Sequence, residues 1–213
     1  MMSKQKPKED LPKVIAELQA ECAAHPNNVM ARHHLALVFL KTGRTDDAVR
    51  EFNQVLEIDP MSVEAHVNLG AIYFERGQID KALAANQTAV SINPLAARAH
   101  ANLGLIWQQQ GEPDKAIAAY AKATAHDPKL ASAWINLASA QVMAGNFPEA
   151  LIAAEKGVEL DADFPLAQNN LAVALFYLHR YPEALVHAIK ARDLGYQVAQ
   201  QFFDAIHNEM KTP

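Results

Sequence analysis

Small and apolar residues recur along this chain in a fixed register of 34 residues. Leucine, alanine, proline and glycine each hold one position of that register: Leu35, Leu69, Leu103, Leu137 and Leu171; Ala48, Ala82, Ala116, Ala150 and Ala184; Pro60, Pro94 and Pro128; and Gly43, Gly77, Gly111 and Gly145. His179 takes the fifth glycine position. Four independent series in one register indicate an internal repeat, and a period of this length is typical of stacked supersecondary units.

Within one repeat the pattern predicts two helices. In residues 65–73, apolar side chains recur at three- and four-residue spacing, and Gly77 can adopt the left-handed conformation that ends a helix. A second helix is expected from Asp80, as its N-cap, to Ile92. Pro94 stops it, because proline disfavours helix in the residue before it. The five repeats predicted in this way are residues 29–62, 63–96, 97–130, 131–164 and 165–198.

Two segments outside the repeats predict helices that close the ends of the stack. Residues 10–28 form an N-terminal cap helix whose apolar face carries Val14, Ile15, Leu18 and Cys22. Residues 199–213 form a C-terminal cap helix and tail, with Phe202, Phe203, Ile206 and Met210 on one stripe, and residues 1–9 are expected to be a disordered tail. End caps are needed because each repeat buries its apolar face only against a neighbour. We therefore predict an all-α fold of twelve helices.

The repeat resembles the tetratricopeptide repeat family over 170 of the 213 residues. In the third unit the resemblance is carried by Leu103, Gly104, Trp107, Ala116, Tyr120, Ala123 and Pro128. The last two units depart from the family pattern, since Ala162 and Tyr196 replace the proline, Gln141 the aromatic residue and Gly157 an alanine. The resemblance implies a right-handed helix-pair solenoid, in which the first helices of the repeats line a concave groove that binds a partner protein or peptide.

Composition and charge narrow the function classes. The chain has 19 Lys plus Arg, 24 Asp plus Glu and a net charge of −5, which argues against nucleic acid as the main ligand. No apolar stretch approaches the ~20 residues of a transmembrane helix, and the first ten residues lack the apolar core of a secretory signal. The single cysteine, Cys22, excludes a disulfide scaffold. We expect a cytoplasmic protein without membrane insertion.

The histidines do not form a recognisable chemical site. His66 and His100 share one register position, which Trp134 continues, and we interpret them as packing residues with one ring nitrogen hydrogen-bonded. His33 and His34 point about 100° apart on a helix and do not readily chelate one ion. No His-Glu-x-x-His, Cys-x-x-Cys or glycine-rich phosphate loop occurs. We therefore expect no metal, no cofactor and no catalytic activity.

One polar row directly precedes the leucine series: His34, Asn68, Asn102, Asn136 and Asn170. The family resemblance implies that this row faces the groove, where it is similar to the asparagine ladder in the superhelix of O-linked N-acetylglucosamine transferase. Each amide offers two donors and an acceptor, which match the N–H and C=O groups of an extended peptide. In the other interpretation, which stays open, these amides bond locally between neighbouring helices.

Further groove candidates are Phe74, Arg98, Gln108, Gln109, Phe176 and Tyr177. They describe a groove with few charges, which suits an extended peptide or an amphipathic helix. The family's carboxylate clamp for heat-shock chaperones needs Lys and Asn where this chain has His33, Leu37, Val67 and Ala71, which argues against that partner.

The expected function is a non-catalytic adaptor or assembly scaffold that binds a partner protein in the groove. A structural self-association module and a regulatory subunit of a separately encoded enzyme remain alternatives. Occupation of the groove by the chain's own tail also stays open. The sequence identifies neither the partner nor the oligomeric state.

Overall fold

The computed structural model describes residues 10–211, so the tail predicted at residues 1–9 and the last two residues lie outside it. Over that range the regular secondary structure consists of twelve α-helices and no strand. This confirms the predicted all-α fold of helix pairs. Contacts divide the chain into two units, Met1–Pro94 and Leu95–Pro213, which are described separately.

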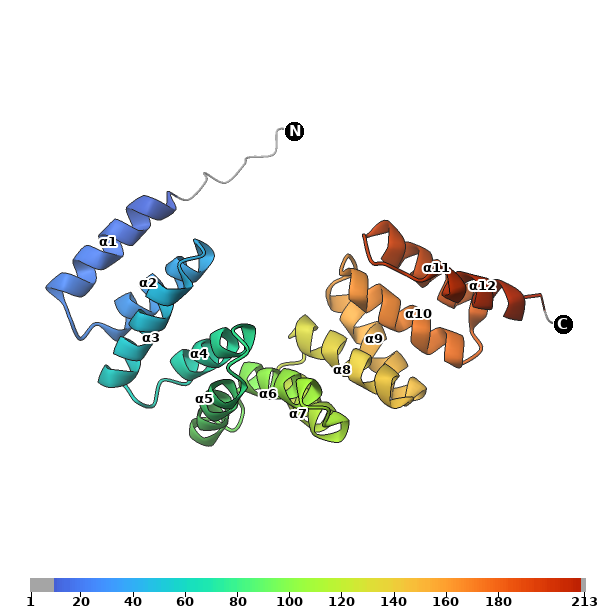
Figure 1. The fold of residues 1–213 in the computed structure, drawn as a ribbon, viewed down its shortest axis with the longest axis horizontal. Coiled ribbons are helices and arrows are strands. Elements are labelled where there is room, and N and C mark those ends of the chain that lie inside the picture. The colour runs from blue at the N-terminus through green and yellow to red at the C-terminus, as the bar shows by residue number, and fades with distance from the viewer. Residues whose placement is uncertain (1–9, 212–213) are drawn as a thin grey trace. The chain divides into compact units, whose positions relative to one another are not determined.

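The first unit contains α1 (Leu11–Ala24), α2 (Val29–Lys41), α3 (Thr45–Ile58), α4 (Val63–Glu75) and α5 (Ile79–Ile92) (Figure 1). Its core is built from residues of the repeating apolar positions, among them Leu35, Phe39, Phe52, Leu69 and Ile72. The apolar face of α1 packs against this core through buried Ile15 and Cys22, as predicted for the N-terminal cap. Burial raises the pKa of the Cys22 thiol, which suits a core residue.

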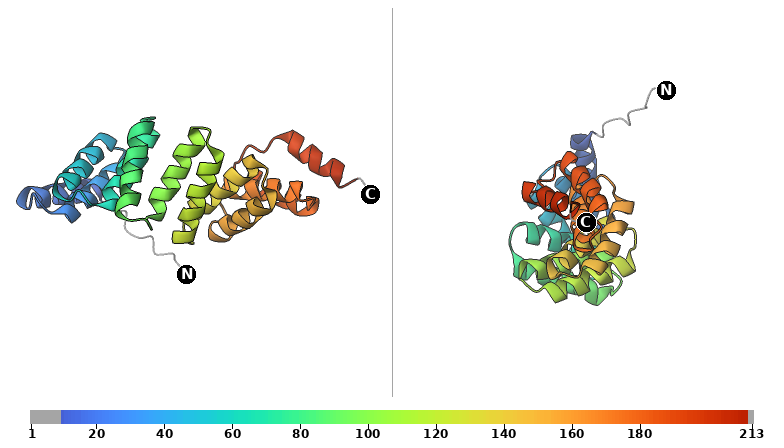
Figure 2. Two further views of the ribbon diagram at one scale, coloured as in Figure 1. Left: turned by 90° about the horizontal axis from the view of Figure 1, so that it is seen from below. Right: turned by 90° about the vertical axis from the view of Figure 1, so that its right-hand side faces the viewer.

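The second unit contains α6 (Ala97–Gln109), α7 (Pro113–His126), α8 (Ala131–Ala144), α9 (Phe147–Leu160), α10 (Pro165–Tyr177), α11 (Tyr181–Asp193) and α12 (Gln200–Glu209). Buried Tyr120, Leu137 and Leu171 belong to its core. The C-terminal helix α12 (dark red in Figure 2) packs against α11. It contributes buried Phe203 and Ile206 to the core, as predicted.

Two helix-end predictions need correction. Met210 is exposed, because it follows the last residue of α12 and lies beyond its apolar stripe. Asp80 is not an N-cap: Gln78 holds that position, and Asp80 lies in the first turn of α5. A carboxylate in a first turn still interacts favourably with the helix dipole.

The turn inside each helix pair requires one residue in the left-handed conformation. The glycine series has φ between 69° and 77° at Gly43, Gly77, Gly111 and Gly145. His179, in the fifth position of that series, keeps the same turn with φ 59°. A non-glycine residue in this region is uncommon. The turn geometry of the repeat is therefore kept at His179 although glycine, which adopts this conformation most easily, is absent there.

Candidate peptide-binding site

Two members of the predicted polar row, His34 and Asn68, lie in the first unit. His34 lies on α2 and is exposed, whereas Asn68 on α4 is buried. The amide nitrogen Nδ2 of Asn68 lies 3.3 Å from Nε2 of His33. This contact joins α4 to α2, so the Asn68 amide links neighbouring helices.

In the second unit the row contains one buried amide and two half-buried ones. Asn170 on α10 is only 3% exposed, and its Nδ2 donates to the carbonyl oxygen of Ile135 on α8 at 3.1 Å. Asn102 and Asn136 keep part of their surface exposed. Asn68 and Asn170 therefore make inter-helix contacts, as the structural interpretation expects. The side chains of Asn102 and Asn136 are half-buried, so a ligand can reach part of their surface.

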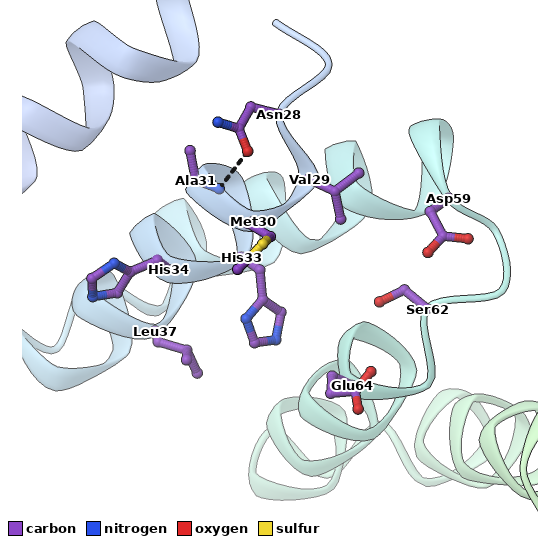
Figure 3. Close-up of a pocket in the computed structure, with 10 residues that line it drawn as sticks. All are labelled: Asn28, Val29, Met30, Ala31, His33, His34, Leu37, Asp59, Ser62 and Glu64. Carbon is purple, nitrogen blue, oxygen red and sulfur yellow. Dashed lines mark hydrogen bonds between the residues drawn. The ribbon is translucent and has the colours of Figure 1, made fainter. Parts of the chain in front are cut away.

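A hollow of about 720 Å³ opens between α2 and α4 in the first unit (Figure 3). The residues that line it are Asn28, Val29, Met30, Ala31, His33, His34, Leu37, Asp59, Ser62 and Glu64. The rings of His33 and His34 point in different directions, and His33 and Leu37 project toward the side of the hollow where Glu64 lies. Asn28 caps α2 by accepting from the Ala31 backbone N–H at 3.1 Å, which holds the rim of the hollow in place.

The hollow exposes apolar side chains that the sequence analysis did not select as site residues. Met30 is 83% exposed and Leu37 is 40% exposed. They lie four residues before and three residues after His34, a spacing that places all three on one face of a helix. The signal was therefore present in the sequence, but it looked like the ordinary apolar periodicity of a core helix.

The two glutamine candidates of the second unit, Gln108 and Gln109, differ in their contacts and exposure. Gln108 accepts from the Tyr120 hydroxyl at 3.0 Å, and it also lines a smaller hollow of about 220 Å³ beside Met143. Gln109 is exposed at the end of α6. Gln108 thus has a structural bond, and Gln109 is available to solvent.

Adjacent aromatic residues at the end of α10 face different surroundings. Tyr177 is half exposed, and its ring stacks on that of Phe147 at 4.0 Å. The Phe176 ring packs against those of Tyr181 and Phe202, with centroids 5.6 and 5.3 Å away. Phe176 therefore helps to hold α12, and Tyr177 is the aromatic candidate with an accessible surface.

The two remaining candidates belong to different units. Phe74 is half-buried near the end of α4, and Arg98 is exposed in the first turn of α6. The predicted site residues therefore form two sets, with His34, Asn68 and Phe74 in the first unit and the others in the second.

Among residues 10–211, no group of three or more His, Cys, Asp and Glu side chains is arranged to hold a metal ion. Over the same residues, no helix has the length and apolar character needed to cross a membrane.

Comparisons with known families and structures agree with the helix-pair architecture. Models described as tetratricopeptide repeat match residues 33–97, 97–130, 131–156 and 166–195. No curated protein sequence gives a significant match.

Several solved structures are similar to the chain. YrrB, described as a TPR protein with an unusual peptide-binding site, is 18% identical with a TM-score of 0.65, covering 91% of this chain and 97% of its own. MamA is 29% identical with a TM-score of 0.62, covering 76% and 96%. PilF of Pseudomonas aeruginosa is 21% identical with a TM-score of 0.71, covering 85% and 88%. Four family matches over successive helix pairs, together with this shared fold, show that the chain belongs to the tetratricopeptide repeat family.

Proposed function

We propose that this protein is a non-catalytic adaptor or assembly scaffold that binds an extended peptide or a helix of a partner protein. The proposed binding surface is the inner face of the first helices of the repeats. The observation that carries the proposal is the hollow between α2 and α4, which exposed Met30 and Leu37 line together with His34. A cytoplasmic location is part of the same proposal.

The chemistry of the hollow supports peptide binding. Concave sites usually combine apolar contact area with a few polar groups that fix orientation. Here Met30 and Leu37 supply the apolar area, and His33, His34 and Ser62 supply hydrogen-bonding groups. The fold-level similarity to YrrB, whose description includes a peptide-binding site, is consistent with this role.

A second candidate function, self-association, is favoured by a different surface. Ile152 on α9 and Val186 on α11 are 64% and 62% exposed, and they occupy the same position of the repeat register. Apolar side chains in equivalent positions on two second helices offer a surface for another copy of the chain. Replacing both with serine would lower a concentration-dependent mass in light scattering if this function is correct.

The peptide-binding proposal is tested with the double variant Asn102→Ala/Asn136→Ala. Partners are first captured from a native lysate with the wild-type chain and identified, and their affinity is then measured with purified components. Loss of two amide hydrogen bonds at about 0.5–1.5 kcal/mol each should weaken binding by about five- to 150-fold, with unchanged helicity by circular dichroism. Unfolding of the double variant would assign the amides to the structure, and unchanged binding would exclude them from the site.

A matched variant tests the hollow itself. Met30→Ser/Leu37→Ser removes apolar contact area from two exposed positions, so the fold should remain intact. Binding of the same partner should fall sharply in this variant. Retained binding would mean that the partner uses another surface.

A further inference from the structure

We infer that the hollow between α2 and α4 selects a partner segment in which an apolar side chain lies close to a lysine or arginine. This inference rests on the proposed function, because it assumes that the hollow binds a peptide. It adds the chemical character of the ligand, which the shape of the hollow and the family do not specify.

Apart from its two histidines, the ionisable residues that line the hollow are acidic. Asp59 and Glu64 are its acidic residues, and none of the ten lining residues is lysine or arginine. Glu64 is exposed and makes no ion pair with any residue in the described range 10–211. One oxygen of Asp59 accepts from the Met61 backbone N–H at 3.1 Å, in the loop that leads into α4. A cationic side chain of a ligand would give these carboxylates the partner that the lining does not supply.

Arg32 on α2 lies in sequence between two lining residues of the hollow, but its guanidinium group contacts other residues. Arg32 Nη1 lies 2.9 Å from a carboxylate oxygen of Glu51 on α3, and Arg32 Nε donates to the Pro26 carbonyl at 2.7 Å. Two of the three guanidinium nitrogen atoms of Arg32 therefore bind groups outside the lining of the hollow. Asp59 and Glu64 therefore have no lysine or arginine partner within the lining of the hollow.

The apolar half of the ligand follows from Met30 and Leu37. These residues are seven positions apart on α2, which is about 10 Å along a helix. An extended peptide covers this distance with about three residues. The flexible, polarisable methionine adapts to different apolar side chains, so the hollow should accept several of them as long as a cation lies within reach of Glu64.

The smaller hollow of the second unit has no acidic residue in its lining. Its lining is Gln108, Gly111, Pro113, Ala116, Ala140, Met143 and Ala144, with no charged residue. Selection for a cation is therefore a property of the hollow between α2 and α4, and not of every concave position in the repeats.

The experiment selects random displayed peptides of about nine residues on the full chain. Affinities of the enriched peptides are then measured by fluorescence anisotropy with Asp59→Asn/Glu64→Gln. Asparagine keeps the oxygen that accepts from Met61, so this variant removes charge without removing the loop contact. Glu149→Gln on α9 is the matched control, since Glu149 is an exposed carboxylate that does not line the hollow.

The expected peptides carry an apolar residue near a lysine or arginine. The double variant should bind them about three- to tenfold more weakly, as exposed ion pairs contribute modestly, while Glu149→Gln should leave the affinity unchanged. Replacing the peptide's cation by glutamine should cause the same loss, and the two losses should not add. Higher salt should weaken wild-type binding and have less effect on the double variant.

Several results would overturn the inference. Peptides that need Met30 and Leu37 but bind the charge variant normally would exclude the cation and leave the proposed function intact. Peptides that bind normally to Met30→Ser/Leu37→Ser would refute binding in the hollow itself. Binding that appears only after removal of residues 1–9, which carry Lys4, Lys6 and Lys8, would identify the occupant as the chain's own segment. A dimer lost in Glu64→Gln would identify a second copy.

Discussion

The indole N–H of Trp134 donates to the carbonyl oxygen of Pro128, six residues earlier, at 3.0 Å. Three other residues at this register position make the equivalent bond: Arg32 to Pro26 at 2.7 Å, His66 to Pro60 at 3.0 Å and Gln168 to Ala162 at 2.7 Å. These four side chains share only an N–H donor, which satisfies a carbonyl group in the loop between helix pairs. The prediction that one ring nitrogen of His66 is hydrogen-bonded is confirmed.

This series predicts how His66 can be replaced. His66→Leu removes the donor to Pro60 and should lower the free energy of unfolding by about 0.5–1.5 kcal/mol. His66→Gln should cost less, because Gln168 makes the same bond from the same register position. Urea unfolding of the two variants provides the measurement. Equal losses would show that the ring contributes by packing and not by its N–H group.

The buried amide of Asn170 should matter more to stability than the half-buried amide of Asn136. Asn170→Ala removes the bond to Ile135 and leaves a small cavity, so we expect a loss of about 1–3 kcal/mol. Asn136→Ala should cost less because water can reach its position. Urea unfolding again measures both variants. The opposite order would mean that the inter-helix bond has little energetic value.

Gly104 cannot accept a side chain without movement of Tyr120. An added Cβ at Gly104 would lie 2.5 Å from the Tyr120 ring, whose hydroxyl is held by Gln108 at 3.0 Å. Gly104→Ala should therefore lower stability by about 1–3 kcal/mol.

Tyr120→Phe should relieve part of this cost, because it frees the ring from Gln108. The pair Ala36 and Phe52 occupies the corresponding positions of the first repeat, and both residues are buried there. A double-mutant cycle in thermal or urea unfolding tests the coupling. Strictly additive losses would show that the hydroxyl bond does not fix the ring.

Tyr120 also predicts a loss of stability in alkaline solution. Burial raises the pKa of its phenol well above the ordinary value of 10.0. In the unfolded chain the phenol loses its proton from about pH 10, while the folded chain retains it. The unfolded state is therefore favoured as pH rises above 10, by up to about 1.4 kcal/mol per pH unit.

Tyr120→Phe removes this contribution. Its stability should fall less steeply than that of the wild type between about pH 9.5 and 11, a window set by the ordinary pKa of 10.0 and its upward shift. Urea unfolding across that range gives the comparison. Parallel curves for the two proteins would contradict the assignment.

Leu103 tests the repeat register itself. Its side chain is buried, so Leu103→Ala should cost about 2–5 kcal/mol through lost apolar burial and the cavity left behind. Leu37→Ala is the matched control, since Leu37 belongs to the same residue type but is 40% exposed. Guanidinium unfolding of both variants measures the difference. A Leu103→Ala loss well below 1 kcal/mol would refute the register.

The sequence by itself determined the helix pairs, because their determinants are local and repeat. Apolar spacing defines the helices, and the glycine series marks the turn inside each pair. His179 shows how strongly that register acts, since it adopts φ 59° in place of a glycine. The family resemblance followed from the same positions, and the comparisons confirm it.

Only the tertiary structure decided which members of a row are accessible. Asn136 and Asn170 are identical in register, yet Asn170 is buried against the backbone of a residue 35 positions earlier. Phe176 and Tyr177 are neighbours in sequence, but a helix turns by about 100° per residue, and α12 covers the first of them. Periodicity predicts which face of a helix a residue occupies. Whether that face is buried depends on the helix packed against it, through contacts between residues far apart in the chain.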